Sequence, residues 1–372
     1  MKVLHVYRTY YPDSQGGGQE AIRQICLSTQ ALGVNNTIFT LSPHPSPKTI
    51  QRPEATVVRC RSWAAPASCD LGGVDAIATF RGLVKQADVV HYLFPWPFAD
   101  ILHGFAPQKP SVLTYISDVV RQKWLKTAYA PLMWRTLKGM NAIVTNSPNY
   151  MHSSDVLSDD AVRSKLVQIP LGIVENSHVN EPDSNILSRL NLNAGEPFIL
   201  FIGVFRYYKG LHTLIEASLK TKGRVVVVGA GSESARLKAR VAQLGLQNVT
   251  FAGYVSDVEK MALLKACRAF VLPSHLRSEA YGLVLVEASM CGKPMVTCEI
   301  ATGTSYINLD HQTGFVVPPE SPAALANAMN ILLADQALAE RLGRQARMRY
   351  DIFFSGKAMG KGYFDVFKAV LK

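Results

Sequence analysis

Short runs of apolar, often β-branched residues alternate with longer segments of helical periodicity along the whole chain. In the first half these runs are KVLHVY, NTIFTL, TVVRC, DVVHYL, SVLTYI, AIVTNS and VQIPLG, and in the second half FILFIGV, RVVVVGAG, VTFAGY, AFVLPS, PMVTCE and TGFVVPP. Helix-length segments such as LHTLIEASL, SARLKARVAQLG and ALANAMNILLA lie between them. Strands that are apolar on both faces are typical of parallel sheets covered by helices, so the pattern predicts an α/β fold.

The two series of runs predict two doubly wound, Rossmann-like domains, because right-handed crossovers place helices on both faces of each parallel sheet. The first domain is expected over residues 1–175 and the second over residues 186–352, with the polar segment ENSHVNEPDSN (residues 175–185) as linker. A ligand is expected at the carboxyl ends of the strands, in a central cleft that both sheets face.

Length and composition support a two-domain globular protein. A chain of 372 residues exceeds the size at which one hydrophobic core usually stops growing, and a hydrophobic content of 48% argues against disorder. No window approaches the roughly 18 uncharged apolar residues of a spanning helix, and the N-terminus has no signal-peptide pattern, so a cytoplasmic protein is expected. Six cysteines form no Cys-x-x-Cys pair, which favours buried, reduced thiols over a zinc site or disulfides: Cys26, Cys60, Cys69, Cys267, Cys291 and Cys298.

The net charge of +11 suits an anionic partner, but it does not distinguish nucleic acid, a phospholipid surface and a phosphate-rich substrate. Residues 121–138 contain no acid and combine cations with aromatic rings: Arg121, Lys123, Trp124, Lys126, Tyr129, Trp134, Arg135 and Lys138. This composition predicts either an interfacial helix on an anionic membrane or a solvated helix whose aromatic rings face the core. Pro131 is expected to interrupt any single long helix there.

A glycine loop follows the first predicted strand. Gly16, Gly17 and Gly18 allow a backbone to approach a ligand closely, and the helix that follows offers free N–H groups to an anion. The alternative is a flexible turn. The spacing is not Gly-x-Gly-x-x-Gly, so a dinucleotide site is poorly supported.

Two cations, Arg206 and Lys209, stand between a predicted strand and a predicted helix in FIGVFRYYKGLHTLIEA. A guanidinium and an ammonium beside a helix N-terminus can hold a diphosphate, and the alternative is a solvated basic turn. The run VVVVGAGSES adds Gly229 and Gly231 at another strand end, which is a weak signal by itself.

Two glutamates flank an apolar run in RSEAYGLVLVEASMCGKP. Glu279 is expected to precede a helix that begins at about Tyr281 to Leu283, and Glu287 is expected more than one turn inside that helix. In one interpretation the first N–H groups of the helix, including that of Gly282, face a phosphate, while one acid binds sugar hydroxyls and the other a ribose. In the other interpretation Glu279 caps the helix and Glu287 pairs with a lysine.

Together these features resemble the retaining glycosyltransferases of family 4, which have the two-domain GT-B fold. The resemblance rests on Arg206, Lys209, the spacing of the two glutamates, CGKP and TGFVVPP, and it covers essentially the whole chain. The segments YYPDSQGG, HYLFPWPFAD, RQK and TGTSYIN are most similar to bacterial lipopolysaccharide O-antigen mannosyltransferases that use GDP-sugars. The resemblance implies transfer of mannose from GDP-mannose to a polyprenyl-diphosphate-linked glycan, with retention of configuration. It also implies a peripheral location on the cytoplasmic face of the inner membrane and no nucleic-acid partner.

The resemblance also implies the roles of individual residues. Arg206 and Lys209 would neutralise the donor diphosphate, Glu279 would meet the sugar hydroxyls, and the second glutamate would bind the ribose. Asp118 is a further catalytic candidate, as a residue of the cleft. The implied donor-binding residues are Gly16, Gly17, Gly18, Gly203, Tyr254, Val255, Tyr281, Gly282, Leu283 and Glu287. A C-terminal helix at about residues 353–372 is expected to pack back on the first domain.

Neither a metal nor another cofactor is expected, because the sequence contains no Asp-x-Asp triplet and the cations and helix N-termini can stabilise the departing diphosphate.

Two positions depart from the family pattern. Relatives commonly have histidine where this chain has Leu93 and Ile116, and isoleucine can neither donate a hydrogen bond nor carry charge. His91 nearby is interpreted as a structural histidine rather than a catalytic substitute. An alternative function is therefore a catalytically weak nucleotide-sugar-binding or scaffold subunit of a polysaccharide assembly complex, and turnover would discriminate between the two. An oxidoreductase is disfavoured because no dinucleotide fingerprint is present.

Overall fold

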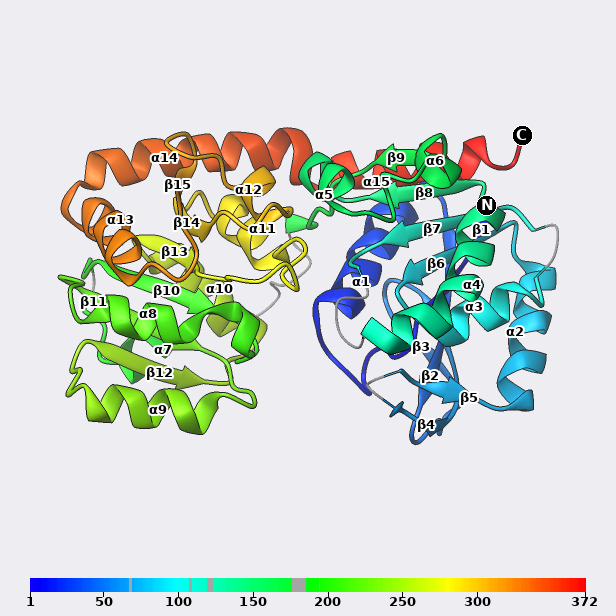
Figure 1. The fold of residues 1–372 in the computed structure, drawn as a ribbon, viewed down its shortest axis with the longest axis horizontal. Coiled ribbons are helices and arrows are strands. Elements are labelled where there is room, and N and C mark those ends of the chain that lie inside the picture. Colours follow the sequence, from blue (N-terminus) through cyan, green and yellow to red (C-terminus); the bar gives the residue numbers. More distant parts are fainter. Residues whose placement is uncertain (67–68, 107–108, 119–122, 176–184, 194) are drawn as a thin grey trace. The chain divides into compact units, whose positions relative to one another are not determined.

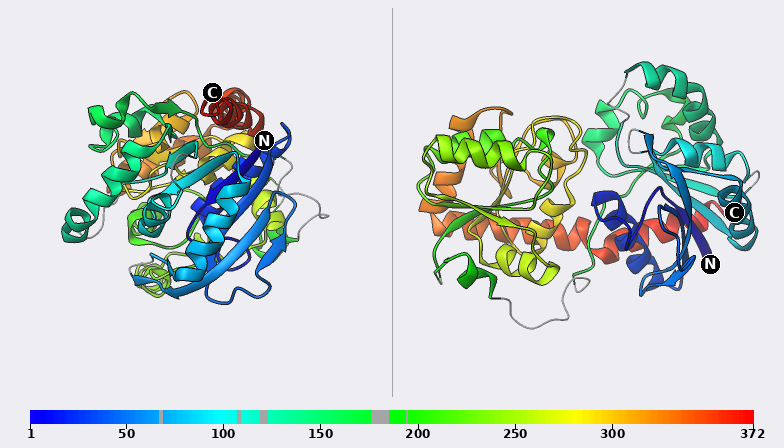
Figure 2. Two further views of the ribbon diagram at one scale, coloured as in Figure 1. Left: turned by 90° about the vertical axis from the view of Figure 1, so that its right-hand side faces the viewer. Right: turned by 90° about the horizontal axis from the view of Figure 1, so that it is seen from below.

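The computed structural model describes residues 1–66, 69–106, 109–118, 123–175, 185–193 and 195–372, without the side chains of residues 123–128. These residues form two compact units (Figure 1). Unit 1 comprises residues 1–174 and 356–372, and unit 2 comprises residues 175–355. Most of the predicted linker, residues 176–184, lies outside the described residues. Each unit has its own sheet with helices on both faces (Figure 2).

Unit 1 is built around a sheet in the order β3-β4-β2-β1-β6-β7-β8-β9, with β5 paired to β4. Its strands are β1 (Lys2–Val6), β2 (Asn35–Ser42), β3 (Thr49–Gln51), β4 (Thr56–Ala64), β5 (Leu71–Gly72), β6 (Val89–Phe94), β7 (Ser111–Tyr115), β8 (Ala142–Thr145) and β9 (Leu166–Gln168). Its helices are α1 (Gly17–Gln30), α2 (Val74–Gln86), α3 (Pro97–His103), α4 (Lys123–Gly139), α5 (Pro148–Ser153), α6 (Asp160–Arg163) and α15 (Gly356–Ala369). The predicted runs form a parallel sheet, whereas the short strands β3 and β5, which the pattern did not predict, pair antiparallel with β4.

Unit 2 contains a fully parallel sheet in the order β12-β11-β10-β13-β14-β15. Its strands are β10 (Phe198–Ile202), β11 (Arg224–Val228), β12 (Val249–Gly253), β13 (Ala269–Leu272), β14 (Met295–Cys298) and β15 (Gly314–Val317). Its helical segments are α7 (Ile186–Arg189), the 3-10 turn η3 (Tyr207–Lys209), α8 (Leu211–Ser218), α9 (Ser234–Gln243), α10 (Asp257–Ala266), α11 (Leu283–Met290), α12 (Thr304–Ile307), α13 (Pro322–Ala334), α14 (Gln336–Arg349) and the π-helical segment η4 (Tyr350–Phe354).

The central strands of unit 2 are buried on both faces, as their sequences predict. Val225 to Val228 of β11 are all buried, and so are the four residues of β13. The strand β10 lies between them, with Ile199 in register with Val225 on one side and Ala269 on the other. The predicted parallel sheet, whose strands are apolar on both faces, is therefore correct for this unit.

A chain of buried polar side chains crosses unit 1 from strand to strand. The Nδ1 atoms of His5 and His91 are 2.9 Å apart, and Nε2 of His91 lies 2.7 Å from the hydroxyl of Thr114. That hydroxyl lies 2.9 Å from the hydroxyl of Tyr363 on α15. Burial lowers the pKa of both histidines, so both rings are neutral at neutral pH. The prediction that His91 is a structural histidine is confirmed.

The two departures from the family pattern lie in one hydrophobic cluster. Leu93 is buried among side chains that include Tyr7 and Tyr10, and Ile116 packs against the same cluster at its edge. Apolar packing thus stabilises both positions in this chain.

The basic segment is only partly described. Arg121 lies outside the described residues, and so do the side chains of Lys123, Trp124 and Lys126. Helix α4 continues through Pro131, so the predicted interruption is wrong. None of the helices in the described ranges is long and apolar enough to cross a membrane.

Tyr129 of α4 faces the protein interior. Its hydroxyl donates a hydrogen bond to Asp100 of α3, a buried carboxyl whose pKa burial raises to about 7 even though hydrogen bonds lower it. Arg135 and Lys138 are exposed, and Trp134 is half-buried. For Tyr129 the core-facing alternative is therefore the correct one, while the two cations remain available to solvent.

Helix α15 packs along α1 and returns the end of the chain to unit 1 (Figures 1 and 2). Gly360 allows this contact, since a Cβ atom there would lie 2.6 Å from the backbone oxygen of Ser28 in α1. Gly82 of α2 provides a contrast, because a Cβ atom there would meet nothing within 4 Å.

Substitution of these two helical glycines by alanine should have opposite effects on stability. We expect Gly360→Ala to destabilise unit 1 by about 1–3 kcal/mol, because the methyl group must push α15 away from α1. We expect Gly82→Ala to stabilise it by roughly 0.5–1 kcal/mol through helix propensity alone. Thermal melts of the two variants against the wild type measure both effects, and a Gly360→Ala protein as stable as Gly82→Ala would contradict the packing argument.

Candidate active site

The strand order of unit 2 identifies the edge at which a ligand is expected. The order β12-β11-β10-β13-β14-β15 has the pattern 3-2-1-4-5-6 of a doubly wound dinucleotide-binding domain. Its direction reverses between β10 and β13, and ligands of such sheets bind outside the carboxyl ends of the two strands at the reversal. The loops that leave β10 and β13 carry Arg206, Lys209 and Glu279.

Gly210 brings these two loops into direct contact. Its φ of 69° lies in the left-handed region, and a Cβ atom at this position would lie 2.0 Å from the carbonyl oxygen of Pro273. The backbone N–H of His275 donates to the carbonyl of Tyr208 at 3.0 Å, which joins the same loops. Only glycine fits at position 210, so the close approach of the two loops requires the glycine that the sequence has there.

Lys209 and Glu279 form an ion pair across this contact. Both side chains are largely buried, and the hydroxyl of Ser274 donates a second hydrogen bond to Glu279 at 3.2 Å. Burial acts to lower the pKa of Lys209, but the attraction of Glu279 and Tyr208 and the hydrogen bond to Glu279 together raise that pKa. The structure therefore brings together two of the predicted catalytic residues.

Arg206 differs from Lys209 in being exposed. It precedes η3, and no acidic side chain of the described residues forms an ion pair with it. Its guanidinium is thus an uncompensated positive charge at the end of β10.

Helix α11 begins at Leu283, as predicted, and Gly282 precedes it with a φ of 85°. The N-cap residue of this helix is Gly282 rather than Glu279, and the Glu279 carboxylate is hydrogen-bonded by Lys209 and Ser274 instead. Tyr281 is buried, and Gly303 contacts its ring so closely that a Cβ atom there would lie 2.5 Å from it. The residues that precede α11 are therefore closely packed against Gly303.

Glu287 does pair with a lysine, as one of the two interpretations held. The ammonium of Lys260 on α10 lies 2.8 Å from Glu287 and 3.2 Å from Asp257. Burial acts to lower the pKa of Lys260, but the attraction of Glu287 and Asp257 raises it. A ribose at Glu287 would therefore meet a carboxylate that is already held in place by a cation.

The other predicted donor-binding residues of unit 2 lie near strand ends as well. Gly203 follows β10, and Tyr254 and Val255 follow β12, where Tyr254 is 79% exposed. Gly229 and Gly231 have a packing role: a Cβ atom would lie 2.1 Å from the carbonyl oxygen of Gly203 at the first and 2.4 Å from that of Phe205 at the second.

The predicted site residues of unit 1 lie at the start of α1 and three residues beyond the end of β7. Helix α1 begins at Gly17, and Gly18 is required by packing because a Cβ atom there would lie 2.3 Å from the hydroxyl oxygen of Tyr7. Asp118 accepts hydrogen bonds from Tyr115 at 2.9 Å and from Ser154 at 2.6 Å. The carboxylate is thus held in a fixed orientation within unit 1.

Two family models match the chain, the "Glycosyl transferase 4-like domain" over residues 16–172 and "Glycosyl transferases group 1" over residues 183–349. The D-rhamnosyltransferase WbpZ of Pseudomonas aeruginosa is 45% identical over 95% of this chain and 92% of its own. The O-antigen chain mannosyltransferase C of Escherichia coli is 38% identical over 100% of this chain and 99% of its own. The chain belongs to the group 1 glycosyltransferases. The predicted family is confirmed.

This glycosyltransferase also shares its fold with solved structures. Sucrose-phosphate synthase from Thermosynechococcus elongatus aligns with a TM-score of 0.79 at 23% identity, covering 99% of this chain and 98% of that one. Anabaena HepE in complex with UDP aligns with a TM-score of 0.77 at 18% identity, covering 99% and 100%. The predicted GT-B class, two Rossmann-like domains with parallel sheets, is confirmed by these neighbours.

Sequence reasoning missed the partners that hold the acids of the glycosyltransferase. Ser274 contacts Glu279 and Lys260 contacts Glu287, but the sequence identified neither residue as a partner of these acids. Lys260 lies 27 residues before Glu287 on another helix, so its spacing carried no signal. The signal for Gly210 was present, since a glycine directly after Lys209 and before a helix indicates a left-handed residue.

Removal of Lys209 should reveal its structural role in this glycosyltransferase. We expect Lys209→Met to destabilise unit 2 by about 3–5 kcal/mol, because the Glu279 carboxylate is left buried without its cation. The double variant Lys209→Met/Glu279→Gln should recover much of this loss, since neither charge then remains.

The exposed pair Lys361–Asp365 serves as control, and Lys361→Met should cost less than about 0.5 kcal/mol. Denaturation of the variants measures the coupling. Additive losses in the Lys209/Glu279 double variant would show that the two charges do not interact.

Proposed function

We propose that this glycosyltransferase transfers mannose from GDP-mannose to a lipid-linked glycan in O-antigen biosynthesis, with retention of configuration. The E. coli relative at 38% identity is an O-antigen chain mannosyltransferase, and the P. aeruginosa relative at 45% is a rhamnosyltransferase. A manno-configured hexose suits both names, because rhamnose is 6-deoxymannose. Binding of a nucleotide sugar is supported by structural neighbours solved with UDP and with UDP-glucose.

The observation that carries the proposal is the Lys209–Glu279 ion pair at the strand reversal of unit 2, with Arg206 three residues before Lys209 on the same loop. Breaking the bond between the sugar and the phosphate leaves a nucleoside diphosphate whose negative charge grows in the transition state. Arg206, an exposed and uncompensated guanidinium, and the Lys209 ammonium can donate charge-assisted hydrogen bonds to those oxygens. The backbone N–H groups of Tyr281, Gly282 and Leu283 at the start of α11 would add to them.

Glu279 and the acceptor complete the proposed reaction. Oε2 of Glu279 accepts a hydrogen bond from Lys209, and the other carboxylate oxygen can accept hydrogen bonds from sugar hydroxyls. The acceptor hydroxyl forms the new bond to the anomeric carbon on the face that the phosphate leaves. The bonding electron pair goes to the departing phosphate oxygen, which takes the acceptor proton. No metal is required in this proposal, because the cations and the helix N-terminus supply the positive charge.

The remaining assignments extend this donor site. Glu287, fixed by Lys260, would bind the ribose, with Gly203, Tyr254 and Val255 as further donor-binding residues. On unit 1 we assign the Gly16, Gly17 and Gly18 loop to the donor and Asp118 to the catalytic residues.

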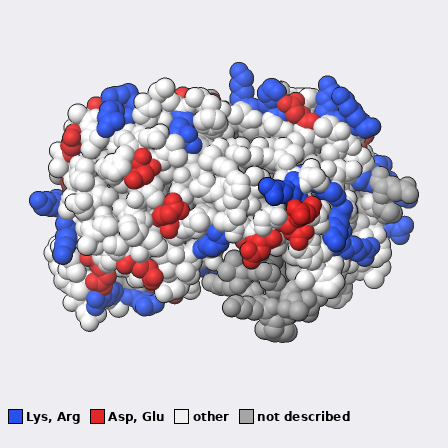
Figure 3. Space-filling view, turned by 45° about the horizontal axis from the view of Figure 1, so that its top comes forward, with Lys and Arg blue, Asp and Glu red and all other residues white. Residues whose placement is uncertain are grey.

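A peripheral position on the cytoplasmic face of the inner membrane belongs to the same proposal. The net charge of +11 and the exposed Arg135 and Lys138 of α4 support attraction to an anionic surface. On the face drawn in Figure 3, however, Lys and Arg side chains are spread out and interspersed with Asp and Glu. We therefore propose weak, reversible attachment.

A donor screen tests the proposal directly. The purified protein and a polyprenyl-diphosphate-linked glycan are incubated with GDP-mannose, GDP-rhamnose, UDP-glucose or UDP-N-acetylglucosamine, and the products are weighed by mass spectrometry. We expect one added hexose with GDP-mannose. Arg206→Ala should lower kcat/KM roughly ten- to hundredfold without lowering the melting temperature, because one charge-assisted contact is lost from an exposed residue.

Transfer from GDP-rhamnose but not GDP-mannose would show that the sugar is assigned wrongly. Absence of turnover with all donors, with GDP binding retained, would favour the scaffold subunit.

The two glutamates should differ in kinetics. Glu279→Gln removes charge beside the anomeric carbon, where cationic character develops, so kcat should fall about ten- to hundredfold with little change in KM. Glu287→Gln weakens a nucleoside contact that is made equally in the ground and transition states, so mainly KM should rise.

Because both acids are buried beside lysines, these assays are run well below the melting temperature of the weaker variant, with the active fraction determined by GDP titration. A change in KM alone for Glu279→Gln would contradict its assignment.

A further inference from the structure

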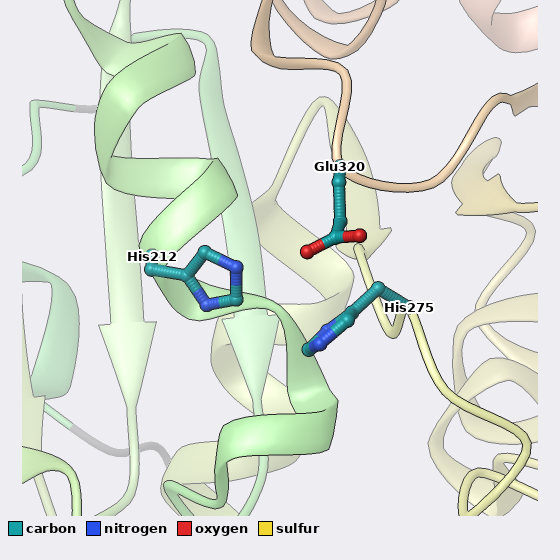
Figure 4. A group of neighbouring side chains, drawn as sticks. All are labelled: His212, His275 and Glu320. Carbon is teal, nitrogen blue, oxygen red and sulfur yellow. The ribbon is translucent and has the colours of Figure 1, made fainter.

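Three potential metal ligands lie close together on unit 2. His212 lies in the first turn of α8, His275 follows β13, and Glu320 follows β15. Figure 4 shows the three side chains approaching one another from these separate segments. One ligand atom from each lies within 4.8 Å of the other two.

His275 has no partner that explains its position. The residue is only 7% exposed, and both ring nitrogens are buried without a hydrogen-bond partner among the described residues. An unsatisfied buried imidazole is costly, because its nitrogens have lost water and gained nothing in return. The ring instead lies edge-on to Tyr207 and His212, with ring centroids 4.9 Å and 5.0 Å away.

The surroundings keep both rings suitable as ligands. His212 stacks on Tyr207 with ring centroids 5.3 Å apart and an angle of 10° between the rings. Burial lowers the pKa of both histidines, and for His212 the neighbouring His275 lowers it further, so both are neutral at neutral pH. Neutral imidazole is the form that binds metals.

We propose that His212, His275 and Glu320 bind one divalent transition-metal ion of the Zn²⁺ class. Two imidazole nitrogens and one carboxylate oxygen are a common zinc ligand set that leaves a further position for water, whereas Mg²⁺ and Ca²⁺ prefer oxygen alone. Small side-chain rotations would bring the three atoms to the usual metal–ligand distances of about 2.0–2.2 Å. This site is independent of the proposed transfer reaction, which uses no metal.

The ion would join three separate segments of unit 2. His212 lies three residues after Lys209, and His275 lies four residues before Glu279, so the metal would link the segments that carry the catalytic ion pair. Glu320 would add the loop before α13. The expected effect is a stabilised loop arrangement around Gly210 rather than a contact with the donor diphosphate.

Zinc titration of the full-length, metal-stripped protein tests the site. Isothermal calorimetry and thermal melts are performed on the wild type, His212→Phe, Glu320→Gln and the control His311→Phe. His212→Phe keeps an aromatic ring on Tyr207 but removes the nitrogens, Glu320→Gln changes an exposed residue, and His311 is an exposed histidine elsewhere in unit 2.

We expect one Zn²⁺ per wild-type chain and a rise in melting temperature on binding. Affinity should fall at least about tenfold in His212→Phe and in Glu320→Gln and stay unchanged in the control. No saturable binding to the wild type would overturn the proposal, as would unaltered affinity in His212→Phe, which would mean that other groups such as cysteine thiolates bind the ion. No donor or acceptor is used, so this result and the outcome of the transferase assay are separate.

Discussion

The close approach of Gly210 to the carbonyl of Pro273 is the constraint on which the candidate active site depends. Any side chain at position 210 would collide with that carbonyl oxygen, and its φ of 69° would strain any other residue. Because the two backbones touch here, the loop after β10 and the loop after β13 meet at the strand reversal of the sheet. The Lys209–Glu279 pair and the proximity of His212 to His275 both follow from this one contact.

At this edge of the sheet the acidic side chains are paired with lysines, whereas Arg206 is not paired with an acid among the described residues. Both candidate acids are already paired with buried lysines, Glu279 with Lys209 and Glu287 with Lys260. Such pairs lose hydration on burial and contribute little to stability by themselves, but they fix the carboxylates in one orientation. The excess positive charge for a diphosphate then comes from Arg206 and from the N-terminus of α11.

Much of the fold could be predicted because the central strands are apolar on both faces, and this property is visible in any short window of sequence. The antiparallel strand β3 was not predicted because it has only three residues, of which Thr49 and Gln51 are exposed. The passage of α4 through Pro131 was missed because a proline costs a helix one hydrogen bond and adds a steric clash, and tertiary packing decides whether the helix outlasts that cost. Local sequence does not contain that information.

The sequence predicted the residues of the candidate site but not the ion pairs that hold its two glutamates. Arg206, Lys209 and the two glutamates stand at strand ends and helix starts, positions that sequence patterns indicate. The ion pairs that hold the acids join residues 70 and 27 positions apart, and only the folded sheet brings them together. For the same reason no motif indicated His212, His275 and Glu320, which lie on three separate segments.

The most direct test of this account is a crystal structure of the full chain with bound GDP. The account predicts diphosphate oxygens within hydrogen-bonding distance of the Arg206 guanidinium, the Lys209 ammonium and the first N–H groups of α11, with the ribose hydroxyls on Glu287. The account would be contradicted by GDP that binds away from the loops that follow β10 and β13 and makes no contact with Lys209 or Arg206.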